Sequence, residues 1–167
     1  SLAFLGRIAG SVLPGSKVTA FNPEVFESGQ VTVGFDFEMP ALTPDALDRV
    51  GIVLGDPAGG IASRLPSDVH LYNEHRGSPV VLPGKMTQRV KLRIKTEKRD
   101  IIHAPGAVDI DNTIGHFSMR SDKNAGWITV DREFSVFVTV VEAAAWPDIR
   151  ALLLEDADTG GKTILLK

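Results

Sequence analysis

The sequence contains no cysteine. Disulfide bonds, thiolate metal sites and cysteine nucleophiles are therefore excluded within these 167 residues. Long apolar runs are also lacking, and none approaches the roughly 18 residues that a membrane-spanning helix requires. The formal net charge is −3, so the chain lacks the excess of lysine and arginine that favours nucleic acids or anionic membranes as partners.

The composition of the chain is that of a folded domain. Hydrophobic residues make up 43% and charged residues 23% of the chain, which is typical of a globular protein with a core. The 16 glycines and 10 prolines favour many turns between short strands. We predict a single β-sandwich-like domain over residues 25–167, preceded by a linker or edge segment over residues 1–24. The first residues lack the charged start of a signal peptide, and we expect the chain to be part of a larger protein.

Alternation of apolar and polar residues predicts three main strands, namely Gln30–Met39, Gln88–Thr96 and Trp127–Val141. The last of these is the longest, and a hairpin turn at residues 123–126 leads into it. Shorter strands are expected at Lys17–Phe21, Gly51–Leu54, Val69–Tyr72, Pro79–Leu82, Ile101–Ile102, Val108–Ile110 and Gly115–Arg120, the first of them stopped by Asn22-Pro23.

Two helical segments are predicted among the strands. Thr43, Pro44 and Asp45 have the residue types of a helix start, and Leu47 would be the buried residue of that helical turn. A short helix is expected over Asp148–Asp156, followed by a break at two glycines and a final strand, Thr163–Leu166. The predicted fold is therefore mainly β, an antiparallel sandwich of immunoglobulin or fibronectin type with a short C-terminal helix and a last strand.

Several segments resemble a known family in their order and pattern. They are Arg76-Gly-Ser-Pro-Val-Val-Leu-Pro83, His103-Ala-Pro105 with Val108, Ile110, Asn112, Gly115 and Phe117-Ser118, then Gly126-Trp-Ile128 with Arg132-Glu-Phe134, Trp146 with Ile149-Arg150 and Leu152-Leu153, and Ile164-Leu-Leu166. This order resembles the C-terminal β-rich region of bacterial transglutaminase-like proteins, which carry an N-terminal β domain of unknown function before a papain-like core.

The resemblance implies a noncatalytic role. In that family the Cys-His-Asp catalytic group lies in the papain-like core, and no cysteine is present here to carry it over. The resemblance therefore implies an accessory domain without a cofactor, whose partners are the remaining domains of the parent protein. It also implies a periplasmic or extracellular location.

Two motifs suggest metal sites and fit them poorly. The first motif is His70 to His75, whose five-residue spacing does not place both imidazoles on one helix face. The inverted zincin pattern has two residues between histidine and glutamate, whereas three residues separate His70 from Glu74. The calcium-loop-like stretch from Asp109 lacks the required glycine and the final glutamate. We predict no metal site and no catalytic residue. A hydrolase would need a pocket that joins His103 or His116 with a carboxylate.

A basic ridge is the main surface feature that the sequence predicts. We use this name for Arg89, Lys91, Arg93 and Lys95, which alternate along one face of the strand Gln88–Thr96. The ridge can bind an acidic protein surface, an anionic glycan or a lipid headgroup. Alternatively, it is a solvated sheet face that discourages edge-to-edge pairing, with the five acids of residues 142–158 as its counterweight.

Three further residues are predicted to be structural. Arg132 interrupts the apolar face of the longest strand, so its guanidinium group should reach a carboxylate or several carbonyls. Trp127 and Trp146 are expected to seal the core, unless they lie side by side on the surface as a sugar-stacking platform. The functional hypotheses are an accessory domain, a free-standing carbohydrate- or protein-binding module and, as the least supported, an unrecognised hydrolase.

Overall fold

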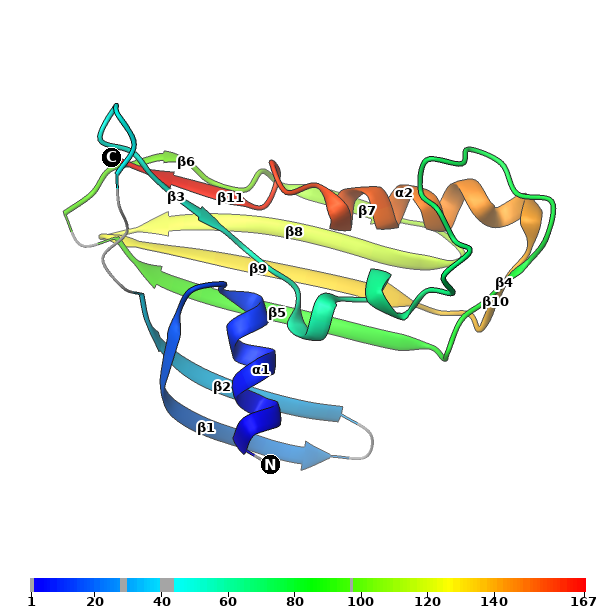
Figure 1. Ribbon diagram of the computed structural model, residues 1–167, viewed down its shortest axis with the longest axis horizontal. Coiled ribbons are helices and arrows are strands. Elements are labelled where there is room, and N and C mark those ends of the chain that lie inside the picture. The colour runs from blue at the N-terminus through cyan, green and yellow to red at the C-terminus, as the bar shows by residue number, and fades with distance from the viewer. Residues whose placement is uncertain (1, 28–29, 40–43, 97) are drawn as a thin grey trace.

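The computed structural model describes residues 2–27, 30–39, 44–96 and 98–167. Its largest element is a four-stranded antiparallel sheet with the order β5-β9-β8-β7 (Figure 1). These strands are β5 (Met86–Lys95), β9 (Trp127–Val136), β8 (Gly115–Asn124) and β7 (Val108–Asp111). Successive residues of a strand point to opposite sides of the sheet. Apolar side chains are therefore buried on one side, and polar side chains are exposed to solvent on the other.

A tight hairpin sets the register at the centre of this sheet. Ala125 and Gly126 join β8 to β9 with φ values of 43° and 81°. Two central residues with positive φ match the right-handed twist of the flanking strands, which favours this two-residue turn. The hairpin predicted at residues 123–126 is confirmed.

A second layer covers the apolar face of the four-stranded sheet. It contains a three-stranded antiparallel sheet of β3 (Val50–Val53), β11 (Thr163–Leu166) and β6 (Ile101–His103), in the order β3-β11-β6. Helix α2 (Trp146–Ala157) belongs to the same layer and lies end to end with β11 along the long axis (Figure 1). The predicted fold class is confirmed: the chain is mainly β, its sheets are antiparallel, and a short C-terminal helix precedes the last strand.

The core lies between these two layers. Phe117 and Phe134 of the four-stranded sheet meet edge to face, with ring centroids 5.8 Å apart, and both are fully buried. Leu152 of α2 is likewise buried, and Gly115 lets the layers approach closely. A Cβ atom at Gly115 would lie 2.2 Å from the Ser135 carbonyl oxygen and 3.0 Å from Leu152 Cδ1.

Short elements connect the layers. Strands β4 (Val80–Val81) and β10 (Val140–Val141) form a two-stranded ribbon. Three 3₁₀ turns lie at Pro57–Gly59, Ala62–Arg64 and Ala143–Ala145, the last of them directly before α2.

The N-terminal part of the chain is a helix followed by a hairpin that projects from the sandwich (Figure 1). Helix α1 (Leu2–Val12) is followed by β1 (Lys17–Glu27), which pairs with β2 (Gln30–Glu38). The Gly55 amide donates to the Val12 carbonyl at 2.8 Å and so ties the end of α1 to the sandwich. Residues 1–24, expected to be a linker or edge segment, thus contribute α1 and most of β1.

Several local predictions are wrong. Strand β1 continues through Asn22-Pro23, and Pro23 is tolerated because β1 is an edge strand that pairs only with β2 among the described strands. No helix forms after Pro44, where the Asp45 carboxylate accepts hydrogen bonds from the backbone amides of Leu47 and Arg49 and holds a turn. Leu47 is 60% exposed rather than buried. Thr43 lies outside the described residues.

Two predicted strands also differ from the structure. Val69–Tyr72 is a turn, in which the Asn73 amide donates to the His70 carbonyl at 3.2 Å. The long strand predicted to reach Val141 ends at Val136, and residues 140–141 pair separately with β4. Apolar alternation continues across the break, which is why the sequence pattern does not reveal it.

Candidate functional site

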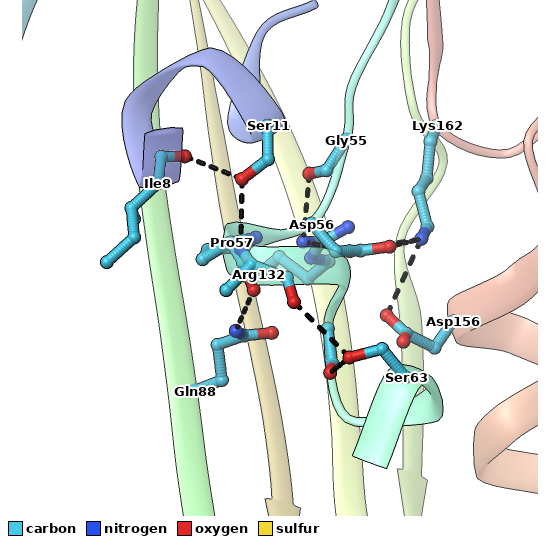
Figure 2. A network of polar contacts seen from close by, with 12 residues as sticks. Ile8, Ser11, Gly55, Asp56, Pro57, Ser63, Gln88, Arg132, Asp156 and Lys162 are labelled. Atoms are coloured by element: carbon cyan, nitrogen blue, oxygen red, sulfur yellow. Dashed lines mark hydrogen bonds and ion pairs between the residues drawn. The ribbon is translucent and has the colours of Figure 1, made fainter. Parts of the chain in front are cut away.

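Four charged side chains from four parts of the chain meet in the interior (Figure 2). Arg132 of β9 forms an ion pair with Asp56, which lies in the loop after β3. Lys162 Nζ lies 3.0 Å from Asp56 Oδ2 and 3.5 Å from Oδ1 of Asp156, near the end of α2. Arg132, Lys162 and Asp156 are all buried, with exposed fractions of 6%, 3% and 3%. We call these four residues the buried ion cluster.

The buried ion cluster balances two positive and two negative side chains. Buried charges are tolerated only when they are paired and hydrogen-bonded, since they lose their hydration. Burial raises the pKa of Asp156 and the charge of Asp56 adds to this effect, whereas the ammonium group of Lys162 opposes it. Arg132 Nη2 also donates to the Gly55 carbonyl at 3.2 Å, while the buried Nη1 has no hydrogen-bond partner among the described residues.

The loop that carries Asp56 is held by further polar contacts (Figure 2). The Ala58 amide donates to Ser11 Oγ of α1 at 2.9 Å, and Gln88 Nε2 of β5 donates to the Pro57 carbonyl at 3.1 Å. Through these contacts and the ion pairs, one short loop connects α1, both sheets and α2. The buried ion cluster therefore has a structural role, because it holds these elements together.

The sequence anticipates one member of this cluster. Arg132 was predicted to reach a carboxylate or carbonyls, and its partners are Asp56 and the Gly55 carbonyl. Asp156 and Lys162 were missed because their charges look like ordinary surface charges in the sequence. Position 156 falls on the buried face of α2, at the spacing of Leu152 and Leu153, and this periodicity was the available signal.

The two tryptophans do not form a sugar-stacking platform. Trp146 is buried at the start of α2, where its Nε1 donates to the Asn73 carbonyl at 2.7 Å. Trp127 is half-buried at the start of β9, and the Arg93 guanidinium lies 4.2 Å from the ring centroid. The starts of α2 and β9 lie toward opposite ends of the molecule (Figure 1).

The basic ridge lies on the outer face of β5, and all four of its side chains are exposed. Its register partners on β9 include Glu133 opposite Arg89 and Asp131 opposite Lys91. Arg89 forms an ion pair with Glu133, and this guanidinium lowers the pKa of the Glu133 carboxyl. Acidic side chains opposite the ridge thus come from the neighbouring strand β9, whose contribution the sequence pattern did not reveal.

The outer sheet face forms a shallow hollow of about 770 Å³, which includes His116 beside Asp109. His116 Nδ1 lies 3.7 Å from Asp109 Oδ1 and 3.8 Å from Asp111 Oδ1, beyond hydrogen-bond distance. Both aspartates belong to strand β7, so they do not form a calcium loop. His103 lies on β6 of the other sheet. In the described ranges, no three histidine or carboxylate side chains are grouped to hold a metal ion.

A groove of about 630 Å³ lies between β2 and β5. Residues 35–39 form one wall and residues 92–96 form the other. Half-buried Phe35, Phe37, Ile94 and Trp127 supply the apolar part of its surface, and Arg93 and Lys95 of the basic ridge border it. The groove therefore combines apolar surface, basic side chains and two strand edges.

Comparisons with known proteins show the fold alone. No protein-family model matches the chain, and no curated protein matches it. A solved structure described as a "putative protease" from Parabacteroides distasonis ATCC 8503 is similar over 71% of this chain, with a TM-score of 0.60 and 18% identity. The match spans 23% of that longer chain. No helix within the described residues is long and apolar enough to cross a membrane.

Proposed function

We propose that this chain is a noncatalytic accessory domain of a larger bacterial transglutaminase-like protein, which acts in the periplasm or outside the cell. The observation that carries the proposal is that a similar fold covers 23% of a longer chain, which is described as a "putative protease". The sequence resemblance points in the same direction, because the papain-like core of transglutaminase-like proteins has the cysteine chemistry of one protease class.

The surface offers a region suited to packing against another domain. Val81 and Val140 are register partners in the β4–β10 ribbon and are 66% and 43% exposed. Phe137, which precedes this ribbon, is also exposed. Exposed apolar side chains that gather in one place favour contact with a further protein surface. In the proposed function, this ribbon packs on the catalytic core of the parent protein.

Two measurements test the proposal. The complete coding region is expected to contain a segment with cysteine, histidine and aspartate in papain-like order beside the segment for residues 1–167. A reading frame without such a segment would refute the assignment. In hydrogen exchange, the ribbon is expected to exchange more slowly in the complete polypeptide than in residues 1–167 alone, and equal rates would exclude the packing.

A second candidate function is a free-standing carbohydrate-binding module, favoured by one exposed aromatic residue. Tyr72 is 76% exposed and stacks on His70, with ring centroids 5.2 Å apart. Its loop is anchored to α2, since Arg150 Nε donates to the Leu71 carbonyl at 2.7 Å. An aromatic ring held on a firm loop can stack on a sugar. Soluble oligosaccharides should then shift the NMR signals of Tyr72, and Tyr72→Ala should abolish the response; unchanged spectra would exclude this function.

A further inference from the structure

The edge of β5 that borders the groove has main-chain groups available for pairing. Directly after β5, the Thr96 amide donates to the Gly126 carbonyl at 2.8 Å, on the side of β9. Successive residues of a strand direct their amide and carbonyl groups to opposite edges. Lys95 and Arg93 therefore direct these groups away from β9, toward the groove. No strand within the described ranges pairs with this edge of β5.

The groove has the length and surface for one extended segment. Its β5 wall covers residues 92–96, and a strand of about five to seven residues, at about 3.4 Å per residue, would run along it. Phe37 and Ile94 offer half-buried apolar surface to every second side chain of such a segment. The remaining side chains of the segment would lie on the face that carries Arg93 and Lys95.

The charges along the groove determine what kind of segment fits. Opposite charges on paired strands attract, so acidic side chains are favoured across from Arg93 and Lys95. The other wall carries Asp36 and Glu38 and repels acidic side chains, which keeps them on the β5 side. A second copy of β5 fits poorly, because antiparallel pairing would set basic side chains opposite each other.

We infer that the groove between β2 and β5 binds an extended peptide segment with acidic side chains at alternate positions, which adds as a strand to the edge of β5. Main-chain hydrogen bonds to Arg93 and Lys95 hold the segment, and its apolar side chains enter the groove. The inference deepens the proposed function, because it states the class of partner that the domain recognises. Peptide binding is measured on residues 1–167 without the catalytic domain. A negative result there can therefore be distinguished from a negative result of the coding-region test.

The test uses residues 1–167 and three synthetic seven-residue peptides. The first alternates valine and glutamate, the second has lysine in place of glutamate, and the third is the first with N-methyl groups on its pairing edge. Amide exchange and chemical shifts measured by NMR report on the site. Only the first peptide should bind and slow exchange of the Arg93 and Lys95 amides, because N-methylation removes the main-chain hydrogen bonds. Equal binding of the lysine or the N-methylated peptide would overturn the inference, as would unchanged exchange.

Variants separate the hydrogen bonds from the charges. Arg93→Pro removes an amide that faces the groove and none that pairs with β9, and it should abolish binding. Arg93→Gln keeps the amide and should weaken binding by about two- to fivefold. Arg89→Gln, on the same ridge outside the groove, is the matched control and should leave the affinity unchanged. An equal loss with Arg89→Gln would assign binding to the ridge as a whole and overturn the inference, as would concentration-dependent dimerisation through β5.

Discussion

Replacing Asp56 with alanine tests the role of the buried ion cluster most directly. Asp56 pairs with both Arg132 and Lys162, so its removal leaves two buried cations with Asp156 as the remaining acid of the cluster. Breaking a buried ion pair by removing one partner costs about 3–5 kcal/mol, because the other charge stays buried without compensation. We expect Asp56→Ala to lower the free energy of unfolding by about this amount, a large part of the roughly 5–15 kcal/mol typical of a domain.

Arg132→Met provides the matched comparison from the other side of the ion pair. Methionine keeps an apolar side chain within the core and removes the guanidinium group, including the unpartnered Nη1. Asp56 keeps Lys162, whose Nζ lies 3.0 Å from Oδ2, so the carboxylate stays paired. The expected loss is about 1.5–3 kcal/mol, that of a hydrogen bond to a charged group. The double variant should cost less than the sum of the two single losses, because both act on one contact.

The assay is urea unfolding at pH 7, followed by circular dichroism and extrapolated linearly to water. Asp56→Asn retains the shape of the side chain and removes its charge. If Asp56→Ala is unfolded even without urea, Asp56→Asn is measured in its place. The reasoning is refuted if Asp56→Ala stays within about 1 kcal/mol of the wild type, or if it costs less than Arg132→Met.

Two further predictions concern the same region. A Cβ at Gly55 would lie 1.9 Å from the Ser11 carbonyl oxygen, so Gly55→Ala should displace α1 and cost at least about 1–3 kcal/mol in urea unfolding. Gly51→Ala, where a Cβ meets nothing within 4 Å, is the control, and equal losses would contradict the close approach. Burial raises the pKa of Asp156 above its ordinary 3.8, so the folded state binds the proton of this carboxyl group more tightly than the unfolded chain does. The contribution of Asp156 to stability therefore falls as pH rises through the raised pKa. Asp156→Asn should lack this fall when urea unfolding is measured at pH values increasing from 3.8, and a curve parallel to that of the wild type would speak against it.

Strand positions with strong alternation were predictable from the sequence. The strand predicted over Gln88–Thr96 corresponds to β5, and Thr163–Leu166 matches β11 in full. Alternation works there because one face of each strand is buried and the other is wet. The end of β9 was not predictable in this way, because the apolar pattern continues past Val136 while the chain leaves β9 and residues 140–141 pair with β4.

The buried ion cluster shows the limit of sequence reasoning. The need of Arg132 for a partner was predictable, because a charge on an apolar strand face must be paired. The identity of that partner was not, since Asp56 is distant in the sequence and comes close only when the loop after β3 folds over β9 (Figure 2). The groove was hidden for the same reason, because its walls are the separate strands β2 and β5.

The local features of this protein follow from its sequence: the alternating strands, the glycine-containing hairpin before Trp127, the C-terminal helix and the basic ridge on β5. They depend on the period of side chains along a strand or helix, which a linear pattern records. Tertiary packing, in contrast, sets Asp131 and Glu133 beside the ridge, completes the cluster with Asp56 and Lys162, and places β2 across the groove from β5. Such contacts depend on how distant segments meet, because burial and pairing are properties of the assembled layers.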